Sequence, residues 1–265
     1  MKKNLLLLIA ALLMTLAGCA PKGQTLLPHD TASERWQAFV SRSSGPGSYD
    51  ALSGSLRFGP TDDTRRVTYT LWSGLPEQDA DAPKDGERII RIEIGAGIGG
   101  SVGKMRIADG GMTLILPKDG SAYAGSASDE NLRRLLGLSM PFSVQGLNDF
   151  LAGRLFSALD EPLPERYETQ EDGSFVYACR TMSGTAEIEL DNRALPVRCT
   201  MSRGWEMDIA YDENGLPAKI SGRAESSSGE QRMVLLVKER RPASSMQASG
   251  LGLDIPAGFT AYSLD

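Results

Sequence analysis

The chain has 265 residues, with 28 basic and 34 acidic side chains and a formal net charge of −6. An acidic excess argues against a nucleic-acid-binding protein, which needs Lys and Arg clustered on one face, and against electrostatic docking on anionic lipid. Composition is otherwise that of a globular protein, and the length suits one large β domain or two small ones.

The N-terminus has the pattern of a secretory signal. Lys2 and Lys3 precede an apolar run over residues 5–16, shorter than the roughly 20 residues that a membrane-spanning helix needs. We predict removal of residues 1–18, which takes Lys2 and Lys3 away and lowers the net charge from −6 to −8. Residues 19–29 then form a short tether, and residues 30–265 form a single domain.

Small residues lead directly into Cys19, in the order Leu-Ala-Gly-Cys. This arrangement resembles the lipobox of bacterial lipoproteins, and the resemblance implies acylation of Cys19 and retention at a membrane surface. Several acyl chains, at about 0.8 kcal/mol per buried CH₂, make a nearly permanent anchor. The alternative is an ordinary secreted protein with a cysteine near its cleavage site by chance.

A helix is predicted from about Thr31 to Ser43, because Asp30 or Thr31 can cap it and Glu34 follows three residues after Thr31. Alternating apolar and polar residues then predict about ten short strands. The clearest alternation runs over residues 205–211, which predicts one dry and one wet face. The strand patterns lie at about 67–72, 89–94, 101–107, 112–116, 186–191, 205–212, 216–224, 231–240 and 253–262.

The middle of the chain has helical spacing instead. Leucines recur at helical intervals over residues 129–138, and a second apolar face predicts one helix over about residues 143–159. Helices at the start and in one central block, among many strands, indicate an α+β fold. A strongly curved antiparallel sheet with the helices on its concave face fits this order.

Cys179 and Cys199 lie on predicted strands two apart in a meander. Adjacent strands are about 4.8 Å apart, so a gap of two strands exceeds the usual Cα separation of a disulfide, about 5.5–6 Å. An oxidising compartment nevertheless permits a bridge. Both a disulfide and two buried free thiols remain open.

Two glycine motifs suggest chemistry that their context does not support. Residues 95–100 match G-x-G-x-x-G, but a strand pattern follows instead of the helix that a dinucleotide site requires. Residues 99–103 match G-x-S-x-G, yet the only histidine, His29, lies in the tether, and a serine nucleophile needs a nearby base. A mobile hairpin loop is the simpler interpretation of the first motif. For the second, a Ser-Lys pair remains open, although nothing in the sequence marks one.

Metal binding is also poorly supported, because one tether histidine and two separated cysteines make no zinc pattern. The carboxylates at 187, 189, 191, 206, 208 and 212 fall on the wet faces of strands. A glycosidase pair can still form from carboxylates distant in sequence. We predict no enzyme, no cofactor, no metal and no catalytic residue.

Residues 131–143 and 147–153, Asn-Leu-Arg-Arg-Leu-Leu-Gly-Leu-Ser-Met-Pro-Phe-Ser and Leu-Asn-Asp-Phe-Leu-Ala-Gly, resemble the LolB family of outer-membrane lipoprotein receptors. More loosely, the chain is similar to the superfamily of lipoprotein carriers that includes LolA. The similar segment covers about residues 30–160, and only strand order matches beyond it. The resemblance implies an unclosed antiparallel β-barrel whose cavity takes acyl chains of lipoproteins.

The resemblance also implies partners, a location and a membrane-insertion loop. The partners are lipoprotein acyl chains, a periplasmic lipoprotein carrier and, through the lipid anchor, the outer membrane; the protein faces the periplasm. Ala20 after Cys19 agrees with outer-membrane sorting. The family carries an exposed apolar residue on a projecting loop, here Ile98 between Gly97 and Gly99, where the family usually has Pro-Leu-Gly.

An acyl chain needs a dry concave surface with few polar contacts. The inner face of the predicted sheet, with the second helix, provides such a surface. A structural or interaction lipoprotein with the same fold and a filled core is the alternative. The residues predicted to line the cavity are Tyr69, Leu71, Ile92, Ile94, Leu114, Leu147, Leu151, Trp205, Met207 and Ile209.

Overall fold

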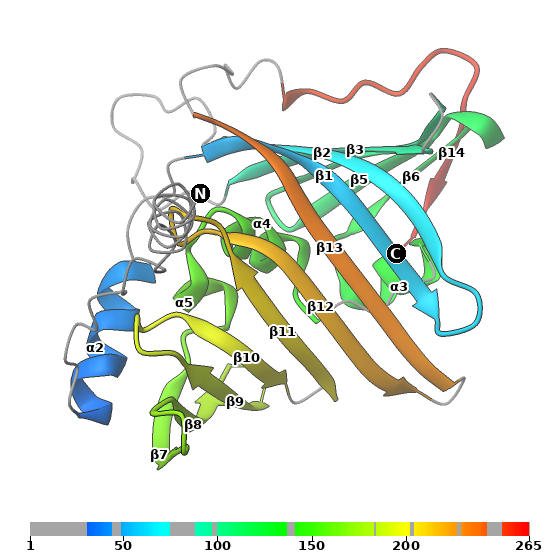
Figure 1. Ribbon diagram of the computed structural model, residues 1–265. Helices are drawn as coiled ribbons and strands as arrows, with labels where there is room; N and C mark the ends of the chain where they lie inside the picture. Colours follow the sequence, from blue (N-terminus) through cyan, green and yellow to red (C-terminus); the bar gives the residue numbers. More distant parts are fainter. Residues whose placement is uncertain are drawn as a thin grey trace, which may run out of the picture.

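The computed structural model is dominated by one large curled sheet with short helices inside the curve (Figure 1). Cys19 and Ile98 lie outside the residues that the structure describes. The described residues are 31–43, 49–74, 88–96, 100–136, 141–182, 184–201, 204–226, 229–242 and 251–264.

The sheet has 14 strands in the order β14-β6-β5-β4-β3-β2-β1-β13-β12-β11-β10-β9-β8-β7. Every neighbouring pair is antiparallel except β14 and β6, which run parallel. The strands are β1 Tyr49–Pro60, β2 Arg65–Gly74, β3 Ile89–Ala96, β4 Ser101–Ala108, β5 Gly111–Leu116, β6 Ser121–Ser126, β7 Leu163–Thr169, β8 Phe175–Thr181, β9 Gly184–Leu190, β10 Pro196–Met201, β11 Trp205–Tyr211, β12 Pro217–Ser226, β13 Gly229–Pro242 and β14 Thr260–Ser263.

The ends of the sheet, β14 and β7, do not pair with each other, so the barrel is unclosed. This confirms the predicted α+β fold with an unclosed, curved antiparallel sheet. The expected number of strands, about ten, was too low. The alternation of residues 205–211 predicted β11 correctly, and its side chains are alternately buried and exposed over residues 205–210.

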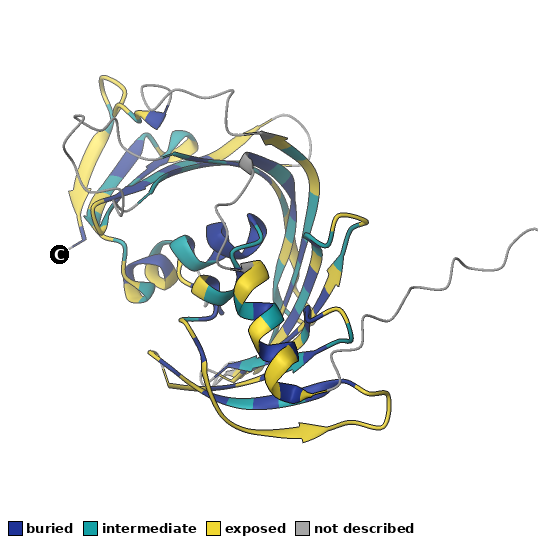
Figure 2. Ribbon diagram, turned by 90° about the vertical axis from the view of Figure 1, so that its left-hand side faces the viewer, coloured by how far each residue is buried: buried dark blue, intermediate teal, exposed yellow. Residues whose placement is uncertain are grey.

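The helices are α2 Ala32–Ser43, α3 Asp129–Leu136, α4 Val144–Leu151 and α5 Leu155–Ala158, with a 3₁₀ turn at Pro117–Asp119. The sheet curves around the central helical block in Figure 2. Of the two capping residues that the sequence offered, Thr31 caps α2, because its Oγ1 accepts a hydrogen bond from the Glu34 amide at 3.2 Å. None of the helices in the described ranges combines the length and apolar character needed to span a bilayer.

The single helix predicted over residues 143–159 is wrong, because the structure divides it into α4 and α5. Gly153 has a φ of 86°, in the left-handed region that favours glycine. The Gly153 amide donates to the Phe150 carbonyl, and the Arg154 amide donates to the Asp149 carbonyl. Helix α4 therefore ends here, and α5 begins after a turn. The apolar spacing was correct, but it did not reveal the change of direction.

Cys179 on β8 and Cys199 on β10 flank β9, as the sequence predicted, and both are buried free thiols. Cys179 pairs in register with Ala186 and Cys199 with Ile188 of the intervening strand. Of the two alternatives left open by the sequence, the structure has the reduced pair.

Candidate functional site

The inner face of the sheet carries the apolar residues that the sequence predicted as a cavity lining. Nine of the ten belong to one buried core cluster, and Ile94 is half-buried and packed against that cluster. Strand register aligns several of them: Leu71 lies opposite Ile92, Ile92 opposite Met105, and Met105 opposite Leu114. These four side chains therefore form a continuous apolar row across β2 to β5.

A second apolar row crosses the other half of the sheet. Ile209 lies opposite Ile220, Ile220 opposite Leu235, and Leu235 belongs to β13, which pairs with β1. Met207 lies one inward position away and is 1% exposed. The two halves meet at β1 and β13, so the inner face is apolar from β5 to β11.

Helix α4 covers part of this face and begins at Ser143. The Ser143 hydroxyl accepts a hydrogen bond from the Gly146 amide at 2.9 Å, which satisfies one of the free amides at the helix start. Leu147 and Leu151 are one turn apart and both buried. The sequence prediction therefore grouped residues from the sheet and the helix that the fold does bury in one cluster.

A buried polar cluster joins α4 to α5, and the sequence analysis missed it. Asp149 Oδ1 accepts hydrogen bonds from Arg154 Nε at 2.9 Å and Arg154 Nη2 at 2.7 Å. Gln145 and Asn148 donate to the same oxygen at 3.3 and 3.4 Å. The Asn-Asp pair in the segment that resembled LolB thus fixes the turn between the helices. In the sequence, the only indication of this contact was an acidic and a basic residue five positions apart, Asp149 and Arg154.

Tyr69 is the polar exception on the inner face. Its hydroxyl donates to the Leu236 carbonyl at 3.2 Å, and burial raises the pKa of this phenol well above its ordinary value. A Cβ on Gly54 would lie 1.9 Å from that same carbonyl oxygen and 2.8 Å from the Tyr69 hydroxyl. Gly54 is therefore required for Tyr69 to lie flat against β1.

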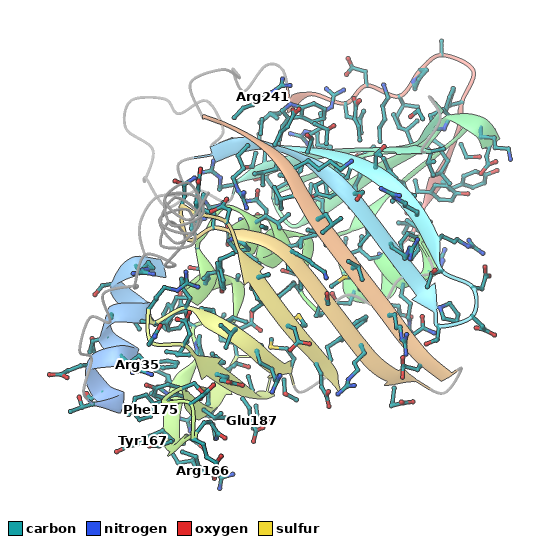
Figure 3. The ribbon with its side chains drawn as sticks, viewed as in Figure 1. Arg35, Arg166, Tyr167, Phe175, Glu187 and Arg241 are labelled. Atoms are coloured by element: carbon teal, nitrogen blue, oxygen red, sulfur yellow. The ribbon has the colours of Figure 1, made fainter. Side chains whose placement is uncertain are left out.

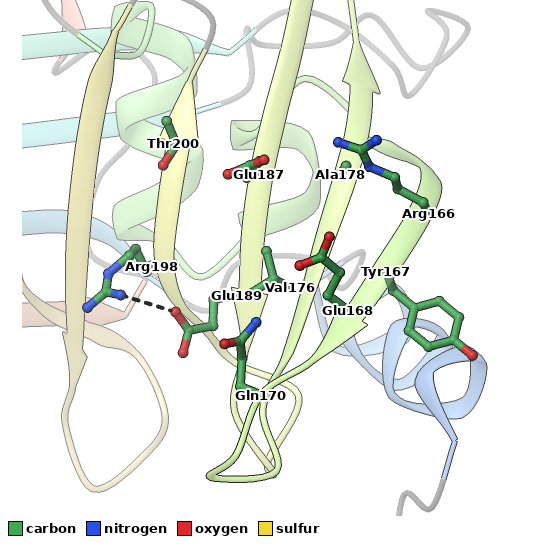
Figure 4. A pocket seen from close by; sticks show the side chains of 10 residues that line it. All are labelled: Arg166, Tyr167, Glu168, Gln170, Val176, Ala178, Glu187, Glu189, Arg198 and Thr200. Atoms are coloured by element: carbon green, nitrogen blue, oxygen red, sulfur yellow. Dashed lines mark ion pairs between the residues drawn. The ribbon is translucent and has the colours of Figure 1, made fainter.

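The outer face of β7 to β10 carries a polar groove of about 310 Å³ (Figure 4). Val176 and Ala178 lie among charged side chains there, and Arg198 pairs with Glu189 at 3.5 Å. This charged surface is unsuited to an acyl chain. The carboxylates at 187, 189, 206 and 208 lie on the outer face of their strands. Asp191 and Asp212 do not, because they lie in the turns after β9 and β11, where they accept hydrogen bonds from the Leu195 and Leu216 amides. The described residues contain no cluster of three metal-ligating side chains.

The predicted membrane-insertion loop, Gly97, Ile98 and Gly99, lies outside the described residues, as does Cys19. The structure does describe the hairpin on either side of the loop. The Ala96 amide donates to the Gly100 carbonyl at 2.7 Å, which brings the ends of β3 and β4 together. The neighbouring Val102 is 42% exposed.

Known structures share this architecture. A LolA superfamily protein from Nitrosomonas europaea aligns with a TM-score of 0.57 at 12% identity, covering 82% of this chain and 97% of its own. A DUF1329 family protein from Desulfovibrio piger aligns with a TM-score of 0.52 at 11% identity, covering 83% and 96%. No family model and no curated protein matches the sequence.

These alignments define the class of fold. The chain has a LolA-type fold: an unclosed, curled antiparallel sheet with helices against its concave face. The sequence resemblance predicted this fold, and the structural similarity confirms it over most of both chains.

Proposed function

We propose that this protein is a lipid-anchored lipoprotein of the outer membrane, facing the periplasm, that binds acyl chains of lipoproteins and helps insert them into that membrane. The acyl chains lie between the inner face of the sheet and the central helical block. A periplasmic lipoprotein carrier delivers the cargo. The process is binding and release, so it requires no catalytic residue and no cofactor.

The observation that carries the proposal is the apolar inner face of an unclosed sheet. It extends from β5 to β11 and is bordered by α4. The outer face of β7 to β10 is charged and differs sharply from the inner face in the ligands that it suits. A LolA-type fold with this distribution supports the binding of hydrocarbon rather than of a polar ligand.

Methionines make the inner face adaptable. Five lie in the buried cluster, and their unbranched, polarizable side chains accommodate irregular apolar shapes. Acyl chains bound here must be held more weakly than by the destination membrane if transfer is to proceed without nucleotide. The five methionines are Met105, Met112, Met201, Met207 and Met233.

One observation favours a second candidate, a structural or interaction lipoprotein with a packed core. Nine of the ten proposed lining residues are at most 8% exposed. Side chains this well covered by their neighbours are typical of a filled interior. Acyl binding then requires the helical block or the inner side chains to move apart, whereas a scaffold does not.

Displacement of a fluorescent fatty acid from residues 20–265 distinguishes the two candidates. Binding at micromolar probe supports the transfer function, and its absence supports the packed scaffold. Ile94→Glu places a carboxylate at the half-buried edge of the inner face and should abolish binding. Thr113→Glu, on the outer face opposite Arg106, is the matched control and should bind as the wild type does.

A further inference from the structure

Strand β7 forms an open edge of the sheet. It is the last strand in the sheet order, and all seven of its residues are exposed. Leu163 and Tyr167 are 56% and 58% exposed, which is unusual for large apolar side chains. Figure 2 shows this exposed strand at the rim of the molecule. An uncovered edge offers unpaired backbone groups to another strand.

The turn after β7 shows which backbone groups face that edge. The Gln170 amide donates to the Ser174 carbonyl at 2.9 Å, so residue 170 is hydrogen-bonded toward β8. Bonded and non-bonded positions alternate along an antiparallel pair. The amides and carbonyls of Tyr167 and Thr169 therefore face away from β8, where no described strand pairs with them.

The charges on β7 are arranged symmetrically about Tyr167. Arg166 and Glu168 lie on the outer face, opposite Ala178 and Val176 of β8, and the Tyr167 ring lies on the other side of the strand (Figure 4). Within the described part of the chain, neither Arg166 nor Glu168 makes an ion pair. An antiparallel copy of this strand centred on Tyr167 would bring each arginine opposite a glutamate.

We propose that β7 pairs with β7 of a second copy of this chain, antiparallel and about a two-fold axis at Tyr167. In this register, Arg166 of each copy lies opposite Glu168 of the other copy, which gives two pairs of opposite charges. The two Tyr167 residues lie opposite each other and exchange backbone hydrogen bonds. A two-fold axis at Arg166 or at Glu168 would oppose like charges, which destabilises a strand pair. The charges therefore select the register.

An aromatic cluster supports the same edge from the inner face. Tyr167 lies 5.8 Å from Phe175 and 6.3 Å from Tyr177 between ring centroids, and Tyr177 lies 4.8 Å from Trp36 of α2. The cluster thus runs from the core to the open edge near Arg35 and Phe175 (Figure 3). Pairing with a second copy covers its exposed end at Tyr167.

The proposed pairing of β7 with β7 involves few residues and joins only two molecules. The register of β7 shifts between Pro164 and Arg166, and proline lacks an amide hydrogen. Only the segment from the bulge to Thr169 can therefore pair, and a two-fold contact uses the same edge on both copies. The arrangement makes a pair of molecules and not a growing sheet.

Cysteine cross-linking of the full chain, expressed in a bacterial periplasm, tests the register. In the proposed pair the Tyr167 Cα atoms are about 5.5 Å apart, within the range of a disulfide. Tyr167→Cys should therefore give a dimer on a non-reducing gel. Thr169→Cys, whose two copies lie roughly 13 Å apart, and the wild type should remain monomeric. Equal cross-linking at both positions, or none at 167, overturns the proposal.

Charge exchange in the Tyr167→Cys background tests the identity of the partner. Arg166→Glu and Glu168→Arg each create two like-charge pairs and should reduce the dimer about tenfold or more. Co-expression of these two variants, or the double exchange in one chain, restores opposite charges and should restore the dimer. A cross-link to a different protein, or no recovery in the mixture, shows that the edge does not bind a second copy.

Discussion

The indole ring of Trp205 lies against the backbone of Gly222 on the neighbouring strand. A Cβ atom on Gly222 would be 3.1 Å from two carbon atoms of that ring, closer than ordinary packing allows. Trp205 pairs in register with Ala224, so its ring leans diagonally across β12. The glycine therefore determines how far a large inner side chain projects from the sheet.

Gly222→Ala should destabilise the protein by about 1–3 kcal/mol, because the added methyl group overpacks the Trp205 ring. The direction of the change in stability is informative, because replacing glycine by alanine within a strand usually stabilises a protein. Urea unfolding measures the change. Gly100→Ala, where the nearest atom to the new Cβ is 4.0 Å away, serves as the control. A stabilised Gly222→Ala variant would contradict the packing described here.

Asp149→Ala should cost about 2 kcal/mol, because it leaves the Arg154 guanidinium without its carboxylate in a mostly buried position. Their side chains are 13% and 14% exposed, so solvent moderates the loss. Asp149→Asn keeps the shape and should cost less. Chemical unfolding and limited proteolysis between α4 and α5 measure the effect. Equal stability of wild type and Asp149→Ala would show that the pair does not hold this turn.

Alkaline pH should destabilise the fold through its buried thiols. Burial raises the pKa of Cys179 from 9.0 to about 12. The folded state therefore keeps a proton that the unfolded chain loses, so the associated stability is complete below pH 9 and is lost as pH rises toward 12. Burial also raises the pKa of Cys199. Unfolding free energies measured from pH 8 to 11 should fall less steeply in Cys179→Ala than in the wild type.

Ile98→Glu should impair lipoprotein delivery in cells while changing thermal stability little, because the proposed role of Ile98 is contact with the membrane. The fraction of a reporter lipoprotein that reaches the outer membrane is the readout. Asn214→Glu adds the same charge at the exposed turn between β11 and β12 and should deliver normally. A large loss of thermal stability in Ile98→Glu would place this residue in the core.

Local patterns predicted much of the fold. The alternation in residues 205–211 identified β11 and its dry face, and the capping pattern at Thr31 identified the start of α2. Strand β1 was missed because small residues and a register shift between Ser53 and Gly54 interrupt its alternation. The helix break at Gly153 was missed because apolar spacing continues through it.

The candidate inner face was predicted almost entirely from side-chain alternation. Burial follows from the two-residue period of a strand, so Leu71, Ile92 and Met207 could be assigned to one face before their neighbours were known. The Asp149–Arg154 contact and the fit of Tyr69 to Gly54 could not be assigned in this way. Both depend on where the backbone turns and which strands become adjacent.

The sequence by itself determined the α+β class and the dry and wet faces of the strands, because both follow from short-range periodicity. Tertiary structure alone decided that β14 runs parallel to β6, that β1 lies beside β13 and that β7 is left as an open edge. Nearly every residue carries the same backbone amide donor and carbonyl acceptor, so these groups do not specify which strand will pair with which. Long-range packing of the whole chain makes that choice.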